Sequence, residues 1–370
     1  MSYSPQNEVD HKSAVDSELV PLPQQLSLLS QYLKNQDWEN AKGFATTLSQ
    51  KFPNHPDPWR ALADLYRREG RSWNALGAQK KLLELQPNDA EAHFDLALLY
   101  GGLGLANEEL TAYFQTLLLD PDFDQAYVAI GQKIRGFRFR SSQPILYPIL
   151  DTLIAAGRYV RPSNVAKAVL SLLSHDPLLE RLLAQPADVE GAEQFRVAVR
   201  GISRVPLLQT LMKDCAIPDL RFEALFNTMR RVALAHLPEL EPSRELLDFL
   251  STLAMHCYTN DYLYPERDDE VALVAELQET ISLAIDRSES ISLTNLLCLA
   301  TYRPIHQLLP VSALTALDTV PELRERIFAE PLIERELIPE IPSLGVITDI
   351  TSIKVRKQYE NNPYPRWVRA

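Results

Sequence analysis

Residues 53–66 (PNHPDPWRALADLY), 87–100 (PNDAEAHFDLALLY) and 121–134 (PDFDQAYVAIGQKI) follow one pattern at a constant step along the chain. Each stretch opens on a proline. It then carries, in the same register, a ring, an aliphatic side chain, a small residue and a second large apolar side chain. These positions hold Trp59, His93 and Tyr127; then Leu62, Leu96 and Ile130; then Ala63, Ala97 and Gly131; and then Tyr66, Tyr100 and Ile134. A repeat of about 34 residues predicts similar supersecondary units stacked on one another.

The same frame extends upstream of residue 53. It holds Leu28, Leu29, Tyr32, Ala41 and Ala45, and Ala41 aligns with Ala75 of the next repeat. Small residues at facing positions let two helices approach closely, while aromatic and leucine side chains fill the space between units. The repeated proline ends a helix because it lacks an N–H and its ring blocks continuation. The pattern favours helical hairpins over an ordinary helical bundle whose loops happen to carry proline.

Residues 22–136 therefore resemble tetratricopeptide (TPR) proteins. The resemblance implies about three and a half hairpins, with residues 124–135 as the first helix of the fourth. In such arrays the first helices line a groove that binds a peptide or protein segment. The groove positions in this frame are Arg60, Asp64, Arg67, Phe94, Leu98, Val128, Gln132 and Arg135. A clamp for a peptide's terminal carboxylate is not expected, because Asp64 and Leu98 replace the asparagines of that pattern and no lysine pairs with them.

The length and composition of the chain narrow the alternatives. A chain of 370 residues is too long for one compact core and predicts two or three domains. Its net charge of −12 argues against nucleic acid as the main partner. Three widely spaced cysteines favour reduced, packed thiols, and no apolar run is long enough to suggest a membrane span. We expect a cytoplasmic protein without a membrane partner.

The remainder of the chain is also expected to be helical, so the predicted fold class is all-α: a TPR superhelix followed by an irregular all-helical domain. Proline placement and apolar spacing predict helices over 218–236 and 242–262, from Asp268 onward, and over 296–309 with a break near Pro304. The predicted divisions are a disordered tail at 1–21, TPR repeats at 22–140, an all-helical domain at 141–338, and a linker with a docking segment at 339–370.

Residues 355–367 (VRKQYENNPYPRW) resemble the segment that precedes the catalytic domain in bacterial TPR-containing methyltransferases that use S-adenosylmethionine (SAM). Residues 257–265 (CYTNDYLYP) and 299–306 (LATYRPIH) are similar to the helical region of that family. The resemblance implies that a methyltransferase domain follows residue 370 and that SAM binds there, with no cofactor in this chain. The chain is then an N-terminal piece or a natural truncation. The segment that would dock onto that domain contains Tyr359, Pro363, Tyr364, Pro365, Arg366 and Trp367, and we expect Trp367 to be loosely held without the domain.

The sequence contains no familiar catalytic or phosphate-binding motif. The glycines at 101–104 fall at the turn of a predicted hairpin, where glycine relieves a tight corner. His256 and Cys257 are neighbours in sequence and diverge by about 100° on a helix, so they do not form a metal pair unaided. His306 follows Pro304, where a role in a helix kink outweighs a role in a pocket.

Two further clusters have structural explanations. Polar and aromatic residues at 260–264 are typical of a helix end. The alternative is that they contact a ligand or another domain. The basic and aromatic residues at 133–140 fit an edge cap of the repeats or a contact for an acidic peptide better than a nucleic-acid site.

The sequence favours a protein-interaction arm that positions a protein substrate for a SAM-dependent methyltransferase domain. Two alternatives stay open. One is a stand-alone TPR scaffold with no role in methyl transfer. The other is a small-molecule enzyme that uses His256, Asp261 and His306 of the helical domain.

Overall fold

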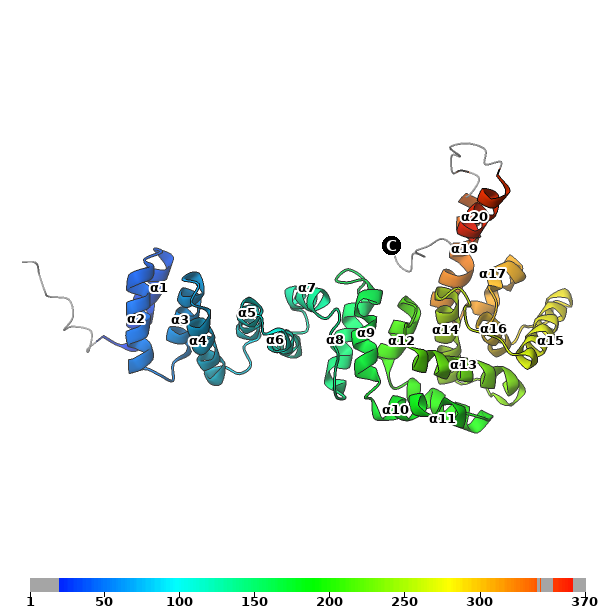
Figure 1. Ribbon diagram of the computed structural model, residues 1–370, viewed down its shortest axis with the longest axis horizontal. Helices are drawn as coiled ribbons and strands as arrows, with labels where there is room; N and C mark the ends of the chain where they lie inside the picture. The colour runs from blue at the N-terminus through cyan, green and yellow to red at the C-terminus, as the bar shows by residue number, and fades with distance from the viewer. Residues whose placement is uncertain (1–19, 338–339, 341–348, 362–370) are drawn as a thin grey trace, which may run out of the picture. The chain divides into compact units, whose positions relative to one another are not determined.

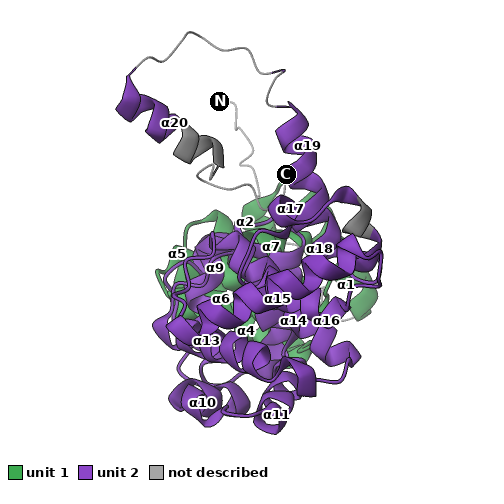
Figure 2. Ribbon diagram, turned by 90° about the vertical axis from the view of Figure 1, so that its right-hand side faces the viewer, with its two compact units in different colours: residues 1–130 green, residues 131–370 purple. Residues whose placement is uncertain are grey.

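The computed structural model describes residues 20–337, 340 and 349–361. The predicted all-α class is confirmed, since the described residues form helices and no strand (Figure 1). The chain divides into two compact units, residues 1–130 and residues 131–370 (Figure 2). The sequence analysis predicted that the repeats end further along the chain, near residue 140. No helix in the described ranges is both long and apolar enough to cross a bilayer.

The first unit consists of helices that pair in chain order. Their bounds are α1 Leu22–Lys34, α2 Trp38–Lys51, α3 Pro56–Arg68, α4 Ser72–Leu85, α5 Ala90–Gly102 and α6 Ala106–Leu119, and α7 Asp124–Lys133 crosses into the second unit. One constant step separates the starts of α1, α3, α5 and α7, and the same step separates the starts of α2, α4 and α6. Helix α3 packs against α2 and α4, and α5 packs against α4 and α6. The period seen in the sequence is therefore the period of the helical hairpins.

The turn inside each hairpin repeats the same backbone geometry. The carbonyl oxygens of Tyr32, Tyr66 and Tyr100 each accept a hydrogen bond from the N–H five residues later, at 2.9 Å. The residue that reverses the chain has a positive φ in every case: 60° at Gln36, 71° at Gly70 and 74° at Gly104. Glycine adopts this region without a Cβ penalty, so the first hairpin carries a strain that the next two avoid.

Exchanging residues at these turns should change stability in opposite directions. We expect Gly70→Ala to lower the free energy of unfolding by about 1 kcal/mol, and Gln36→Gly to raise it by up to about 1 kcal/mol. Gly43→Ala is the matched control. Gly43 lies within α2, an added Cβ meets nothing within 4 Å there, and alanine is the better helix former. Urea unfolding followed by circular dichroism measures all three. A stabilising Gly70→Ala would contradict the turn geometry.

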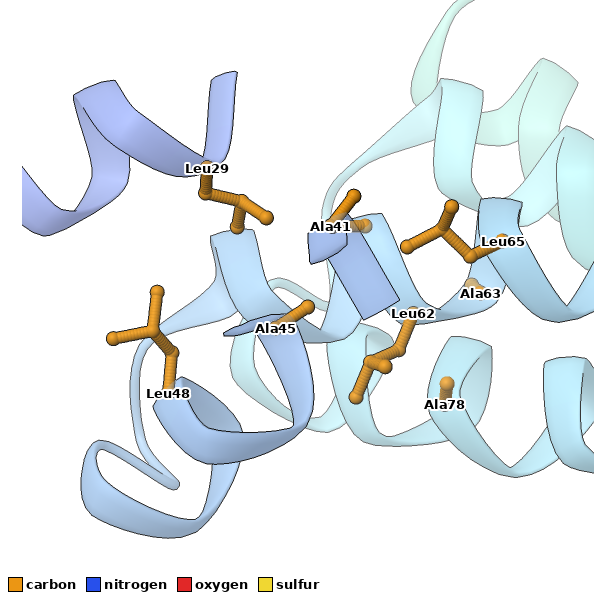
Figure 3. Packing of buried hydrophobic residues seen from close by; sticks show 9 residues of the cluster. Leu29, Ala41, Ala45, Leu48, Leu62, Ala63, Leu65 and Ala78 are labelled. Carbon is orange, nitrogen blue, oxygen red and sulfur yellow. The ribbon is translucent and has the colours of Figure 1, made fainter. Parts of the chain in front are cut away.

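The core between the first hairpins depends on small side chains. Ala41, Ala45 and Leu48 of α2 are fully buried, and they pack in one cluster with Leu29 of α1 (Figure 3). Ala61, Leu62, Ala63 and Leu65 of α3 and Ala78 of α4 complete the cluster. Alanines at facing positions allow the close approach of helices that the sequence pattern predicted.

The repeated proline has a second role. The carbonyl oxygen of Pro53 accepts a hydrogen bond from Trp59 Nε1 at 2.9 Å, and that of Pro87 pairs with His93 Nε2 at the same distance. Because a carbonyl oxygen only accepts, His93 donates from Nε2. In α3 a tryptophan ring and in α5 a histidine ring thus connect the start of the helix to the preceding turn by a hydrogen bond.

The third hairpin has a buried glutamate at a position where the earlier hairpins have alanine, and a glycine faces it. Glu109 of α6 stands where the earlier hairpins have Ala41 and Ala75, and it is buried. Gly101 of α5 faces it, since a Cβ at Gly101 would lie 2.6 Å from Glu109 Oε1. Burial, followed by the charge and hydrogen bond of Glu109, raises the pKa of Tyr113 to about 12. Gly101 therefore makes room for a carboxylate.

The second unit has helices without a fixed period. They are α8 Tyr147–Ala155, α9 Pro162–Leu173, α10 Pro177–Ala184, α11 Ala192–Ile202, α12 Pro206–Asp214, α13 Leu220–Ala235, α14 Arg244–Thr259, α15 Asp268–Asp286, α16 Leu293–Ala300, α17 Ile305–Leu308, α18 Pro321–Arg324, α19 Glu330–Leu337 and α20 Ile350–Asn361. Short 3-10 helices cover Pro144–Leu146, Pro186–Asp188, Leu237–Glu239 and Val311–Leu317, and one turn of π-helix covers Glu325–Ala329.

Helix α14 is the centre of this unit. It packs against α11, α12, α16 and α18, and its residues from Phe249 to Cys257 are buried. The predicted helices over 218–236 and 242–262 correspond to α13 and α14, and the predicted break near Pro304 separates α16 from α17. Helix α20 is capped by Asp349, whose side chain accepts a hydrogen bond from the Ser352 N–H at 2.8 Å.

Candidate functional site

The predicted groove residues of the first unit divide into a charged part and an apolar part. The charged part lies on α3, where Arg60, Asp64 and Arg67 follow one another at helical spacing on one face. Arg60 donates to Asp89 at 2.6 Å and to Gln86 at 2.8 Å. Arg67 donates to Asp95 at 2.7 Å and to Asp64 at 2.8 Å. Both guanidinium groups are therefore engaged with carboxylates of their own chain.

The electrostatics of this charged part agree with the contacts. Burial would raise the pKa of Asp89, but the hydrogen bonds from Arg60 and from the Ala92 N–H outweigh it and lower the pKa. Partial burial dominates at Asp64 and raises its pKa, with the Arg67 charge opposing. These ion pairs are half-exposed, so each contributes at most about 1 kcal/mol to stability. These contacts join α3 to α5 and to the turn that precedes α5.

One repeat further along, the same positions are aromatic. Phe94 and Phe123 stand one repeat step after Arg60 and Asp89, and their ring centroids lie 4.9 Å apart. Phe94 also contacts Tyr113 at 5.4 Å between centroids. Leu98 of α5 is 44% exposed and Val128 of α7 is 42% exposed. The apolar part of the predicted groove thus offers two open aliphatic side chains on successive first helices.

The last two predicted groove residues belong to the second unit. Gln132 is exposed, and Arg135 is exposed and donates to Asn164 Oδ1 at 2.5 Å. The predicted docking residues Tyr359, Pro363, Tyr364, Pro365, Arg366 and Trp367 lie outside the residues whose side chains the structure describes, and the expectation for Trp367 lies there too.

The second unit contains a buried polar cluster around Arg230 of α13, whose side chain is 1% exposed. Its Nη2 donates to the Pro265 carbonyl oxygen at 2.9 Å and lies 3.8 Å from Glu270 Oε1 of α15. Its guanidinium stacks over the ring of Tyr302 at 4.2 Å and lies 5.7 Å from that of Tyr264. The strings 257–265 and 299–306, far apart in sequence, therefore meet at one arginine.

Two further contacts complete this cluster. Tyr302 donates to Glu270 Oε1 at 2.8 Å, and the Arg267 N–H donates to Glu270 Oε2 at 3.0 Å, so both carboxylate oxygens have partners. At the edge, Arg303 donates to both oxygens of Glu266, with 2.9 Å for the Nη2–Oε2 contact. That contact lowers the pKa of Glu266 and raises the pKa of Arg303.

His256 lies beside this cluster and is fully buried. Its Nδ1 lies 3.0 Å from the Met212 carbonyl oxygen, and its Nε2 lies 2.7 Å from the Tyr264 hydroxyl. The carbonyl only accepts, so Nδ1 carries the proton and Nε2 accepts from Tyr264. Burial lowers the pKa of His256 to about 4. Both ring nitrogens are thereby committed to structural hydrogen bonds.

The cysteines are free thiols in the core. Burial raises the pKa of Cys215, Cys257 and Cys298 to about 12, and the Arg230 charge opposes this shift only in part at Cys257 and Cys298. A protonated thiol is a poor nucleophile and a poor metal ligand. Within the part of the chain that the structure describes, no three histidine, cysteine or acidic side chains are grouped to hold a metal ion.

The structure does not bring the residues of the enzyme alternative into one open site. His256 is buried, while His306 pairs through Nδ1 with the Ile327 carbonyl oxygen at 3.2 Å and contacts the Tyr258 ring. Asp261 and Tyr262 both have φ of 56° and reverse the chain directly after α14, with Asn260 at the cap position. Residues 260–264 thus form a helix end, as one of the two readings of the sequence proposed.

Sequence reasoning missed two features. The acidic partners of Arg60 and Arg67 follow 29 and 28 residues later in the sequence. Because this separation is close to one repeat length, the repeat frame places them on the neighbouring hairpin, and this was the signal for the two pairs. Arg230 and Glu270 carried no local signal, because neither belongs to a repeat or a motif. Comparison with known proteins adds no assignment: no protein-family model matches the chain, and the search of curated proteins returns no significant match.

Proposed function

We propose that the first unit is a TPR-like array that binds a protein segment. The observation that carries this proposal is the regular recurrence of the helix starts, the left-handed turn residues and the ring-to-proline hydrogen bonds. Stacked hairpins of this kind present successive first helices on one face, and that face is the usual binding surface of such arrays.

The apolar part of the face is the better candidate for the contact. Arg60 and Arg67 already pair with carboxylates of the chain, so a partner that binds them must first replace those pairs and gains little from the exchange. Leu98 and Val128 are open to solvent, and covering an aliphatic side chain stabilises a complex by about 25 cal/mol per Å² of apolar area. A segment with apolar anchors at a regular spacing fits two such side chains on successive helices.

The resemblance of residues 355–367 extends the proposal. It supports a role in which the captured protein is the substrate, or the partner, of a SAM-dependent methyltransferase domain that is separate from the described residues. A stand-alone scaffold would capture a protein in the same way but would not present it for methylation. One capture experiment therefore tests protein binding for both roles.

The 370-residue chain on beads should capture its partner from a lysate of the source cells, and Leu98→Asp with Val128→Asp should reduce that capture about tenfold or more. Trp73→Asp is the matched control. Trp73 is 67% exposed on α4, a second helix, so its replacement should leave capture unchanged. Circular dichroism checks that all variants keep their helicity. Equal capture by the groove variant and the wild type would exclude the first helices as the binding face.

Mass spectrometry of the captured proteins separates the two roles. Methylated side chains in the captured proteins would support the methyltransferase role. A captured partner without methylation would contradict that role and leave the recognition proposal standing.

A further inference from the structure

The second unit begins with a basic stretch in an acidic protein. Residues 131–167 contain seven lysines and arginines and a single acidic residue, Asp151, while the whole chain carries a net charge of −12. Some arginines elsewhere, such as Arg221 and Arg303, lie against a carboxylate, while others, such as Arg200 and Arg204, form no ion pair with a described residue. Arg135, Arg138, Arg140, Arg161 and Lys167 likewise form no ion pair with any residue that the structure describes, and all five are exposed. We call these five residues the basic strip.

Hydrogen bonds fix how the basic strip lies on α9. Arg135 donates to Asn164 on the first turn of α9, directly after Arg161 at the cap position. Further along, the Phe139 N–H donates to Ser171 Oγ at 3.0 Å, and the Phe139 carbonyl oxygen pairs with His175 Nε2 at 3.3 Å. The segment 135–139 therefore follows the helix from its first turn to its last, and its arginines are spread along that line.

Apolar contacts hold this segment in place. Phe139 is 6% exposed, and its ring meets that of Phe137 edge to face with 4.9 Å between centroids. Ile134 is fully buried, and Gly136 turns the chain with a φ of 82°. Because the aromatic rings are used for packing, Arg138 and Arg140 stay exposed beside them on a fixed backbone, and Arg138 Nη1 donates to the Phe137 carbonyl oxygen at 3.1 Å.

The geometry points to the basic strip as a docking surface for a short acidic segment of a partner protein, rich in aspartate and glutamate. Guanidinium groups bind carboxylates through paired hydrogen bonds, which makes arginine suited to this partner. From Asn164 to Ser171 the helix rises about 10 Å, which matches about three residues of extended peptide. Arg135 is also one of the predicted groove positions, but the contact in the proposed function rests on Leu98 and Val128, which are not part of the basic strip.

Charge favours a short acidic peptide over nucleic acid. Outside residues 131–167 the chain is strongly acidic, and at physiological salt charges act over about 8 Å. A short peptide needs only the basic strip, whereas a long polyanion must also approach the rest of a chain whose net charge is negative. The burial of Phe139 removes one of the two rings on which a base would stack.

The test uses the full chain and a fluorescein-labelled peptide of about twelve glutamates, with fluorescence anisotropy at low ionic strength as the readout. We expect Arg138→Glu with Arg140→Glu to weaken peptide binding about tenfold or more, and added salt to weaken wild-type binding. Arg200→Glu with Arg204→Glu is the matched control. It makes the same change in net charge at two exposed arginines of α11 and the turn after it, and it should change binding less than about twofold.

Three outcomes would overturn the proposal. The peptide fails to bind the wild type, or the two double variants weaken binding equally, or an oligothymidylate of equal charge binds more tightly and loses that binding in the Arg138→Glu, Arg140→Glu variant. The last result would make the basic strip a nucleic-acid surface. Leu98→Asp should leave peptide binding unchanged, which separates this surface from the groove.

Discussion

Replacing Arg230 by methionine is expected to lower the free energy of unfolding of the second unit by about 3–5 kcal/mol. The side chain is 1% exposed and Glu270 is buried beside it, so the change leaves an uncompensated carboxylate in the core. It also removes the hydrogen bond to the Pro265 carbonyl and the stacking over Tyr302. Hydrogen exchange of peptides from α13 to α16, measured by mass spectrometry, reports the opening of this unit separately from the first.

Two further variants make this result interpretable. Arg221→Met removes an arginine of the same helix that pairs with Asp219 at the surface, and it should cost less than about 1 kcal/mol. Arg230→Met with Glu270→Gln removes both buried charges and keeps an oxygen to accept from Tyr302, so part of the lost stability should return. If Arg230→Met costs no more than Arg221→Met, water reaches the cluster and the burial argument fails.

The periodic part of the fold could be predicted from the sequence because its signals are local. Each hairpin carries its alanines, rings and proline within one repeat length, and the helices begin at that same step. The turn at Gln36 shows the limit of this reasoning. Its left-handed geometry follows from the repeat frame, although the residue itself is not glycine.

The buried cluster of the second unit could not be predicted in the same way. Arg230 lies on α13, Glu270 on α15 and Tyr302 just after α16, so no local period connects them. Residues 257–265 and 299–306, which contain Tyr264 and Tyr302, were identified in the sequence only by their resemblance to a protein family. Their common partner is set by tertiary packing, which brings both rings close to one guanidinium.

The groove illustrates a different limit. Helical spacing places Arg60, Asp64 and Arg67 on one face of α3, but spacing says nothing about whether a charge is already paired. The ion pairs with Asp89 and Asp95 depend on the neighbouring hairpin. Side-chain partners across an interface decide which predicted site residues are open to a ligand, and here they shift the candidate contact to Leu98 and Val128.

Acidification should destabilise the second unit through His256 at a pH where carboxylates still carry their charge. Burial lowers the pKa of His256 to about 4, whereas an unfolded histidine has a pKa of about 6.5. Between these values the unfolded chain binds the proton and the folded chain does not. This contribution to stability is therefore complete above about pH 6.5 and is lost as the pH falls toward 4. The loss between about pH 7 and pH 5 amounts to about 2 kcal/mol.

His256→Gln tests the assignment, because glutamine does not titrate and its amide can still meet the Met212 carbonyl and the Tyr264 hydroxyl. Hydrogen exchange in α14 at the two pH values, corrected for the intrinsic exchange rate, gives the change in stability for each protein. The wild type should lose about 2 kcal/mol more than the variant over this range. The other histidines contribute equally to both proteins and cancel in the difference. If both lose the same amount, His256 is protonated in the folded state, and the tautomer derived from its two hydrogen bonds is wrong.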